Sequence, residues 1–226
     1  VEWHGPCNTG PESSRLAQAA VGLSPWGYAM LVNDSKDASQ AYAHIRHPGT
    51  RPLISFWDKI RGEKAAPGRD DLDLRQISPI VPNLLILERD HLHQSYKWRL
   101  AGSEICQLYR QKLTSTNALA GWGGFERNTL KQLLDTVVTG LQPCLVRFQL
   151  STDLGQVIGA ELLGLPILAK NGTRFHVFGG IFPLRDISQL GYDSVTGLEL
   201  SAARSIWTEP LPGDRRLMSG SRNQSA

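Results

Sequence analysis

The chain has 226 residues, of which 41% are hydrophobic and 20% are charged, and its formal net charge is +3. This balance is typical of a globular domain with extensions, and the scattered basic residues do not form the positive stripe of a nucleic-acid-binding protein. No stretch approaches the roughly 18 apolar residues that a membrane span needs.

Three cysteines, Cys7, Cys106 and Cys144, cannot all pair and show no CxxC spacing. We therefore expect neither a disulfide framework nor a zinc site, and we expect a reducing, cytoplasmic location.

The first 48 residues mix small and polar residues with few apolar ones, so we expect residues 1–48 to form a flexible extension. A helix is predicted from Thr50, which we interpret as its cap, to a stop at Gly62. Four apolar residues recur at helical spacing between them: Leu53, Phe56, Trp57 and Ile60.

A β-hairpin and two helices follow. Residues 84–87 form a short apolar run, and residues 96–100 alternate apolar with charged side chains, the period of a half-buried strand. We interpret Ser103 as the cap of a short helix. The strongest helical pattern in the chain ends at Gly140 and has apolar residues at Leu130, Leu133, Leu134, Val137 and Val138.

Three further strands are predicted at residues 146–150, 157–168 and 175–184. The dipeptide Asn171-Gly172 favours a tight hairpin between the last two, because both residue types tolerate a positive φ. The pair Gly179-Gly180 indicates a bulge, or a close approach by a ligand or by backbone.

The order of these elements predicts an α+β fold: a five-stranded antiparallel sheet with helices packed on one face and an N-terminal capping helix. We expect the domain to span residues 49–186 and residues 187–226 to form a largely disordered tail. Two strands, a helical segment and three strands are also the order found in a PAS domain. The free face of such a sheet would be covered by the capping helix, by a ligand or by a second copy.

Five short motifs resemble a group of PAS-like proteins of alphaproteobacteria, many of them single-domain. The group is typified by an aromatic-Trp pair, a Pro-x-Arg and Asp-rich stretch, a strand opened by proline, an Arg-Leu-Ala-Gly strand end after an aromatic residue, and a Glu before Leu-Pro. These correspond here to Phe56-Trp57, Pro67-Gly68-Arg69 with Asp71-Leu72-Asp73, Pro82 to Leu87, Trp98 with Arg99-Leu100-Ala101-Gly102, and Glu161 with Leu165-Pro166.

The chain departs from this group after the first short helix. The group often has Phe-Gly-x-Glu-Leu-Thr-Gly, whereas residues 109–115 here read Tyr-Arg-Gln-Lys-Leu-Thr-Ser, without either glycine or the glutamate. This difference calls into question any turn or ligand contact that the group makes there.

The resemblance implies a sensory or regulatory role in bacterial signalling, through binding of a small molecule or of another signalling protein, or through self-association by the sheet face. It identifies no cofactor. Because no GxSxG, HExxH, HRD or DFG set is present, we expect no catalytic residues, no metal site and no enzyme activity. Arg215, Arg216 and Arg222 are too few for tight binding of nucleic acid.

Six residues are candidates for ligand contact: Arg99, Tyr109, Trp122, Phe148, Glu161 and His176. Tyr109, Trp122 and Phe148 either line a cavity between helices and sheet or belong to the core. Glu161 lies among apolar neighbours, so it needs a partner such as Arg99 or Arg147, or exposure on the open face. Arg99 either meets an anion or Glu161, or is a structurally paired charge.

His176 is either a cofactor ligand or a hydrogen-bonded histidine of the fold. Cys106 lacks the Asn-Cys-Arg-Phe setting of a flavin-binding cysteine, so we interpret it as a core thiol. The alternative to a sensor is a small ligand-binding protein or enzyme acting on an apolar metabolite. That alternative predicts a deep pocket containing Glu161, Arg99 or His176.

Overall fold

The computed structural model describes residues 44–170, 172, 174–187 and 194–206. Its central element is one antiparallel sheet of six strands in the order β2-β1-β5-β4-β3-β6. The strands are β1 (Leu84–Asp90), β2 (Ser95–Ala101), β3 (Cys144–Thr152), β4 (Val157–Leu168), β5 (Phe175–Pro183) and β6 (Val195–Ser205). The predicted hairpin and the predicted three-stranded unit are thus confirmed, and β1 joins them into one sheet by pairing with both β2 and β5.

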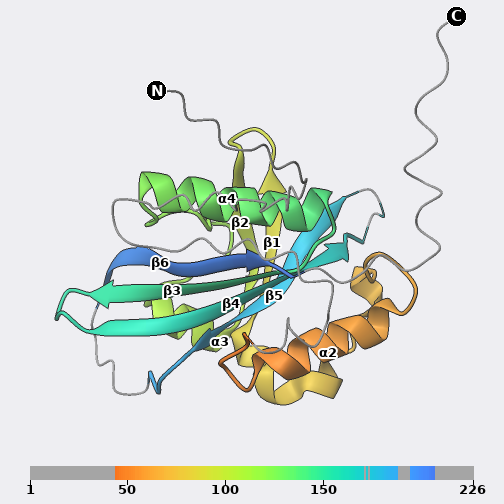
Figure 1. Cartoon of the computed structure of the whole chain (residues 1–226), viewed down its shortest axis with the longest axis horizontal. Helices are drawn as coiled ribbons and strands as arrows, with labels where there is room; N and C mark the ends of the chain where they lie inside the picture. Colours follow the sequence, from red (N-terminus) through yellow and green to blue (C-terminus); the bar gives the residue numbers. More distant parts are fainter. Residues whose placement is uncertain (1–43, 171, 173, 188–193, 207–226) are drawn as a thin grey trace, which may run out of the picture.

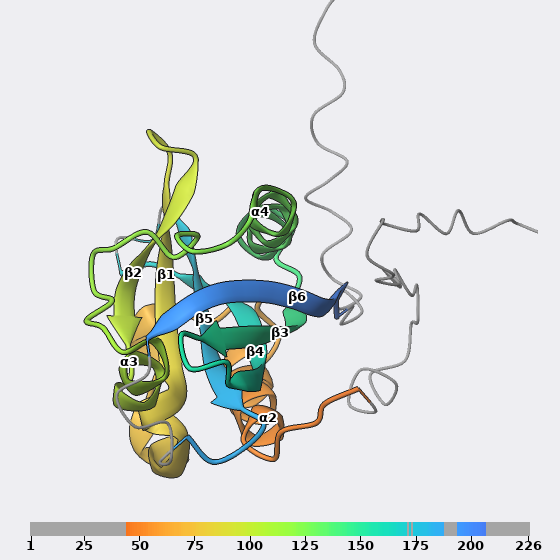
Figure 2. The ribbon, with the colours of Figure 1, turned by 90° about the vertical axis from the view of Figure 1, so that its left-hand side faces the viewer.

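Helices cover both faces of this sheet, as Figures 1 and 2 show. On one face lie α3 (Ser103–Tyr109) and α4 (Gly124–Thr139), and on the other lie α2 (Thr50–Arg61) and the 3-10 segment η2 (Leu74–Asn83), which follows the short η1 (Arg69–Asp71). Of the three alternatives expected for covering the free face, the structure shows the capping helix α2. Within the described part of the chain, no helix has the length and the apolar run that a membrane crossing requires.

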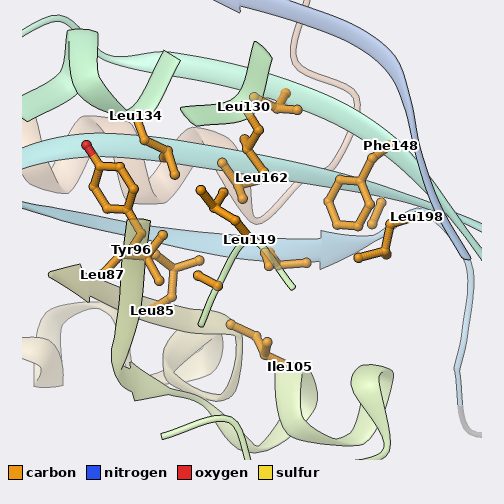
Figure 3. Packing of buried hydrophobic residues seen from close by; sticks show 14 of the residues in the cluster. Leu85, Leu87, Tyr96, Ile105, Leu119, Leu130, Leu134, Phe148, Leu162 and Leu198 are labelled. Atoms are coloured by element: carbon orange, nitrogen blue, oxygen red, sulfur yellow. The ribbon is translucent and has the colours of Figure 1, made fainter. Parts of the chain in front are cut away.

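Two hydrophobic cores result, one on each face. The first joins Leu130 and Leu134 of α4 to sheet residues such as Leu162, in the layer drawn in Figure 3. The second joins Leu53 and Trp57 of α2 to the opposite side of the same strands. Alternate residues of a strand point to opposite faces, so the nearly continuous apolar run of β4 supplies both cores.

The predicted α+β fold is confirmed, but the sheet has a sixth strand where we expected a disordered tail. Residues 195–205 form β6, which pairs with β3 through Leu198 opposite Leu150 and Leu200 opposite Phe148. The sequence pattern was weak because β6 is an edge strand with small residues and irregular register beside β3. Residues 1–43 of the expected extension (1–48) and residues 207–226 of the expected tail lie outside the described residues.

Two predicted helix caps are displaced by one residue. The residue before α2 is Gly49, and Thr50 is the first helical residue, with its side chain bound elsewhere. Gly102, and not Ser103, precedes α3. Gly62 does end α2, in the positive-φ conformation that glycine adopts without strain.

A segment after α3 connects the two edges of the sheet. Residues 115–118 hydrogen-bond to the outer edge of β2, and Asn117 bridges Lys97. A few residues later Trp122 bridges Leu198 of β6, the opposite edge strand. Pairing of this kind satisfies backbone groups that an edge strand would leave open, and it curls the sheet around the first core.

The side chain of Asp135 fixes α4 to the β1–β2 hairpin. The Tyr96 hydroxyl donates to it at 2.9 Å, Lys131 donates at 2.7 Å, and the Nε atom of Arg89 lies 3.3 Å away. Burial raises the pKa of the Tyr96 phenol, so this hydroxyl remains a donor at every physiological pH.

The glycine pair of β5 allows two backbones to approach closely, one of the alternatives expected from the sequence. A Cβ atom built at Gly179 would lie 1.9 Å from the carbonyl oxygen of Leu163 in β4. At Gly159 of β4 the nearest atom would be the Leu184 side chain, at an ordinary 3.4 Å.

We therefore predict that Gly179→Ala destabilises the fold by about 3 kcal/mol or more, because rigid backbone must move. The control Gly159→Ala should change the free energy of unfolding by less than about 1 kcal/mol. Urea denaturation of both variants measures this, and equal midpoints would contradict the assigned register.

Candidate functional site

The six candidate residues do not form one site, because the sheet separates them. Trp122 and Phe148 belong to the core on the α3–α4 side, and Tyr109 packs at its margin. The side chain of Glu161 faces α2, whereas that of Arg99 is 55% exposed on β2. His176 lies near the end of the β1–β5 pairing. The six candidate residues therefore lie in four separate environments.

The carboxylate of Glu161 is the most unusual of these groups, since the residue is completely buried in the middle of β4. The backbone N–H of Arg46 donates to its Oε2 at 3.0 Å, and that of His47 donates to Oε1 at 3.2 Å. The hydroxyl of Thr50 donates to Oε1 at 2.7 Å. Three donors from one short segment thus meet one carboxylate that is more than one hundred residues away in the chain.

Arg147 supplies the opposite charge. It sits directly across from Glu161 in the β3–β4 ladder, on the same face, and its Nε donates to Glu161 at 3.5 Å. Its terminal nitrogen also donates to the backbone carbonyl of His44. Of the partners expected for Glu161 from the sequence, the structure selects Arg147 and not Arg99. Arg147 therefore neutralises the buried charge and binds the N-terminal segment at the same time.

We name residues 44–50 the N-terminal latch, because their contacts hold the start of α2 on the sheet. The ring of His47 stacks on Phe182 of β5, with ring centroids 4.9 Å apart, and its Nδ1 accepts the N–H of Gly49 at 3.0 Å. Burial lowers the pKa of His47, although the negative charge of Glu161 opposes this shift. The imidazole is consequently neutral at pH 7, as acceptance of the Gly49 N–H requires.

Sequence reasoning missed the latch. We had interpreted Thr50 as a helix cap and residues 44–48 as part of a flexible extension. Two of the donors to Glu161 are backbone N–H groups, which every residue except proline carries and which leave no trace in the sequence. The sequence pointed only to Glu161 itself, because a buried carboxylate needs hydrogen-bond donors, but it did not identify which residues would supply them.

The Arg99 side chain pairs with Glu88 on the neighbouring strand at 3.2 Å, and both groups are well exposed. This matches the interpretation of Arg99 as a structurally paired charge. It contacts neither Glu161 nor a described pocket.

His176 borders a small pocket of about 200 Å³ where β1 and β5 separate beyond Leu87 and Val177. The residue is 8% exposed, and its Nδ1 atom is buried without a hydrogen-bond partner among the described residues. Burial lowers the pKa of His176, so the ring is neutral at pH 7. The pocket is also lined by Glu88 and Arg89, each already paired, and by a second cation, Arg174.

A larger pocket of about 290 Å³ lies between the end of α3 and the start of β6. Tyr109 borders it, whereas the rings of Trp122 and Phe148 pack against each other 5.3 Å apart within the core. Among the described residues, no three His, Cys, Asp or Glu side chains gather to hold a metal ion.

The turn that follows α3 keeps a left-handed backbone at the two positions where the related group has glycine. The φ angle is 53° at Arg110 and 69° at Ser115. The departure from the group's motif therefore changes the side chains but preserves positive φ at both positions.

We predict that Arg147→Met destabilises the fold by about 2–4 kcal/mol, because it leaves the carboxylate of Glu161 buried without a counter-charge. The matched control is Arg99→Met, which breaks an exposed pair and should cost less than about 1 kcal/mol. Denaturation midpoints of the two variants measure this, and equal losses would refute the special role of Arg147.

The lowered pKa of His47 predicts a pH dependence. Because the folded protein binds this proton less readily than the unfolded chain, stability is fully retained above pH 6.5. It falls as the pH drops below 6.5 toward the lowered folded-state value. His47→Phe keeps the stacked ring and removes this titration, so its stability should decline less between pH 7 and pH 5. Parallel slopes for the two proteins would show that His47 does not titrate there.

Comparison with known proteins gives one family. No curated protein matches the chain. The family described as PAS domain matches residues 45–182, which include α2, the latch residues from Ile45 to Thr50, the hairpin, both later helices and most of the sheet. Since this match covers more than half of the 226 residues, the protein belongs to the PAS domain family.

Proposed function

We propose that this protein is a cytoplasmic sensory and regulatory module of the alphaproteobacterial PAS-like group. It binds a small molecule or a partner protein and has no catalytic output of its own. Its signal would pass through another signalling protein. The single observation that supports this proposal best is the buried carboxylate of Glu161, which holds the N-terminal latch to the sheet.

A regulatory domain needs an element with two arrangements, and a ligand that prefers one of them. The latch has the properties of such an element. Its polar contacts converge on one buried charge, so they are satisfied together when residues 44–50 are docked and lost together when they leave. Releasing the latch would uncover the Glu161–Arg147 pair and let water reach it.

The covered sheet face changes where a partner would bind. Leu163 and Phe178, two sheet residues on that side, are no more than 1% exposed beneath α2 and η2. In the docked state α2 and η2 cover this part of the sheet, so a partner protein or a second copy would bind this face only after α2 had moved. We propose that the latch controls this movement.

The alternative function, an enzyme acting on an apolar metabolite, receives less support. It requires Glu161, Arg99 or His176 together with a second polar group in a deep pocket. In the part of the chain that is described, Glu161 is enclosed between helix and sheet and Arg99 faces solvent. His176 borders only the smaller pocket, where Glu88 and Arg89 are already paired with Arg99 and Asp135.

The proposal is tested by hydrogen exchange of Glu161→Gln, which retains the shape of the side chain but removes the charge. We expect exchange to rise at least tenfold in the latch and the first turn of α2, while protection in β1 and β5 is unchanged. The control is Glu88→Gln, an exposed carboxylate paired with Arg99, which should leave the latch unchanged.

Unchanged latch protection in Glu161→Gln would refute the role of this carboxylate. Loss of protection throughout the sheet would show that Glu161 maintains the fold and not a switch. Native mass spectrometry of the purified protein would complement this experiment, because it reports a bound small molecule and the stoichiometry together.

A further inference from the structure

The pocket between α3 and β6 has one charged residue in its wall. Its borders are the end of α3 at Tyr109, Arg110 and Gln111, the loop at Gly121, and the first residues of β6, including Val195 and Leu198. In Figure 2 the start of β6 curves toward α3, which places these segments together. Among the residues that the structure describes, no acidic side chain lines this pocket.

Arg110 occupies a backbone conformation that an arginine does not favour. It follows α3 in the left-handed region, with φ 53° and ψ 28°, and its N–H closes the helix on the carbonyls of Cys106 and Gln107. Glycine is the usual residue at this position of a helix end because a Cβ atom is strained there. The Arg110 side chain lies in the wall of the pocket.

The guanidinium of Arg110 has no protein partner among the described residues. Its Nε atom is buried and lacks a hydrogen bond, and neither an ion pair nor a hydrogen bond engages its terminal nitrogens. A group that is always protonated and partly withdrawn from water is costly unless an acceptor meets it. A strained backbone and a buried guanidinium nitrogen without a partner thus occur together at one residue in the wall of a pocket, a combination that favours a ligand site.

We propose that this pocket binds a small organic carboxylate, held by the Arg110 guanidinium, with its hydrocarbon part against Val195 and Leu198. A carboxylate accepts two parallel N–H bonds from a guanidinium, and a single cation balances a single negative charge. The pocket, of about 290 Å³, has room for a small organic acid. This inference deepens the proposed sensory function by naming the class of ligand, and binding can be tested independently of the latch.

The test uses butyrate as the probe and its uncharged counterpart butyramide as the comparison. In ¹H–¹⁵N spectra of the full chain, butyrate at millimolar concentration should shift the amides of Gly121 and Gly197 saturably. Butyramide should bind at least tenfold more weakly. Inorganic phosphate, with its higher charge, should also bind more weakly than butyrate, because the wall offers only one cation.

Arg110→Gly separates binding from folding. It should weaken butyrate binding at least tenfold and yet raise Tm by a few degrees, since glycine relieves the left-handed strain. The control Ser115→Gly relieves the strain at φ 69° in the same turn, and should raise Tm while leaving butyrate binding unchanged.

The proposal is overturned if butyrate produces no saturable shift, if butyramide binds equally well, or if Arg110→Gly binds butyrate as the wild type does. A lower Tm for Arg110→Gly would also overturn it, because the guanidinium would then serve the fold. Failure of the latch experiment on Glu161 would leave these results unaffected, so the two proposals can fail separately.

Discussion

A carboxylate buried in the centre of a sheet lowers the stability of the fold unless hydrogen-bond donors and a counter-charge meet it. In this protein that requirement arises at Glu161, and the elements around it are positioned to meet it. Arg147 on the adjacent strand provides the charge, and residues 44–50 provide the remaining donors. The N-terminal segment is thereby tied to the sheet by polar contacts in addition to the apolar packing of α2. Polar contacts of this kind are directional, so they fix one docking position.

This anchoring closes a face that an α+β sheet of this type could leave open. One core lies beneath α3 and α4, and the other beneath α2 and η2, so the central strands β4 and β5 are buried on both sides. The two edge strands are also partly covered, since residues 115–122 contact both β2 and β6. A signal that reaches these strands would therefore pass through an element packed on them, and the polar contacts of the latch converge on one buried charge.

The pocket at Arg110 and the N-terminal latch lie on opposite sides of the same sheet. The pocket at Arg110 adjoins α3 and β6, whereas the latch contacts β4 and β5 on the side of α2. β6 pairs with β3, and Arg147 of β3 binds Glu161, so a continuous path of paired strands joins the two regions. A ligand that shifts β6 would influence the latch only if it favours one arrangement of these strands over the other.

Local patterns in the sequence determined most of the elements: α4 through its apolar spacing, the hairpins through alternation and turn residues, and the close approach at Gly179. They also determined that Glu161 needed a partner. Only the tertiary structure decided that the partners were Arg147 and the backbone of residues 46–47, that β6 extends the sheet, and that Arg110 is left unpaired in a pocket. The physical reason is that periodicity reports which face a side chain occupies. Pairing with distant backbone groups, which are the same in nearly every residue, depends on how the elements meet in space.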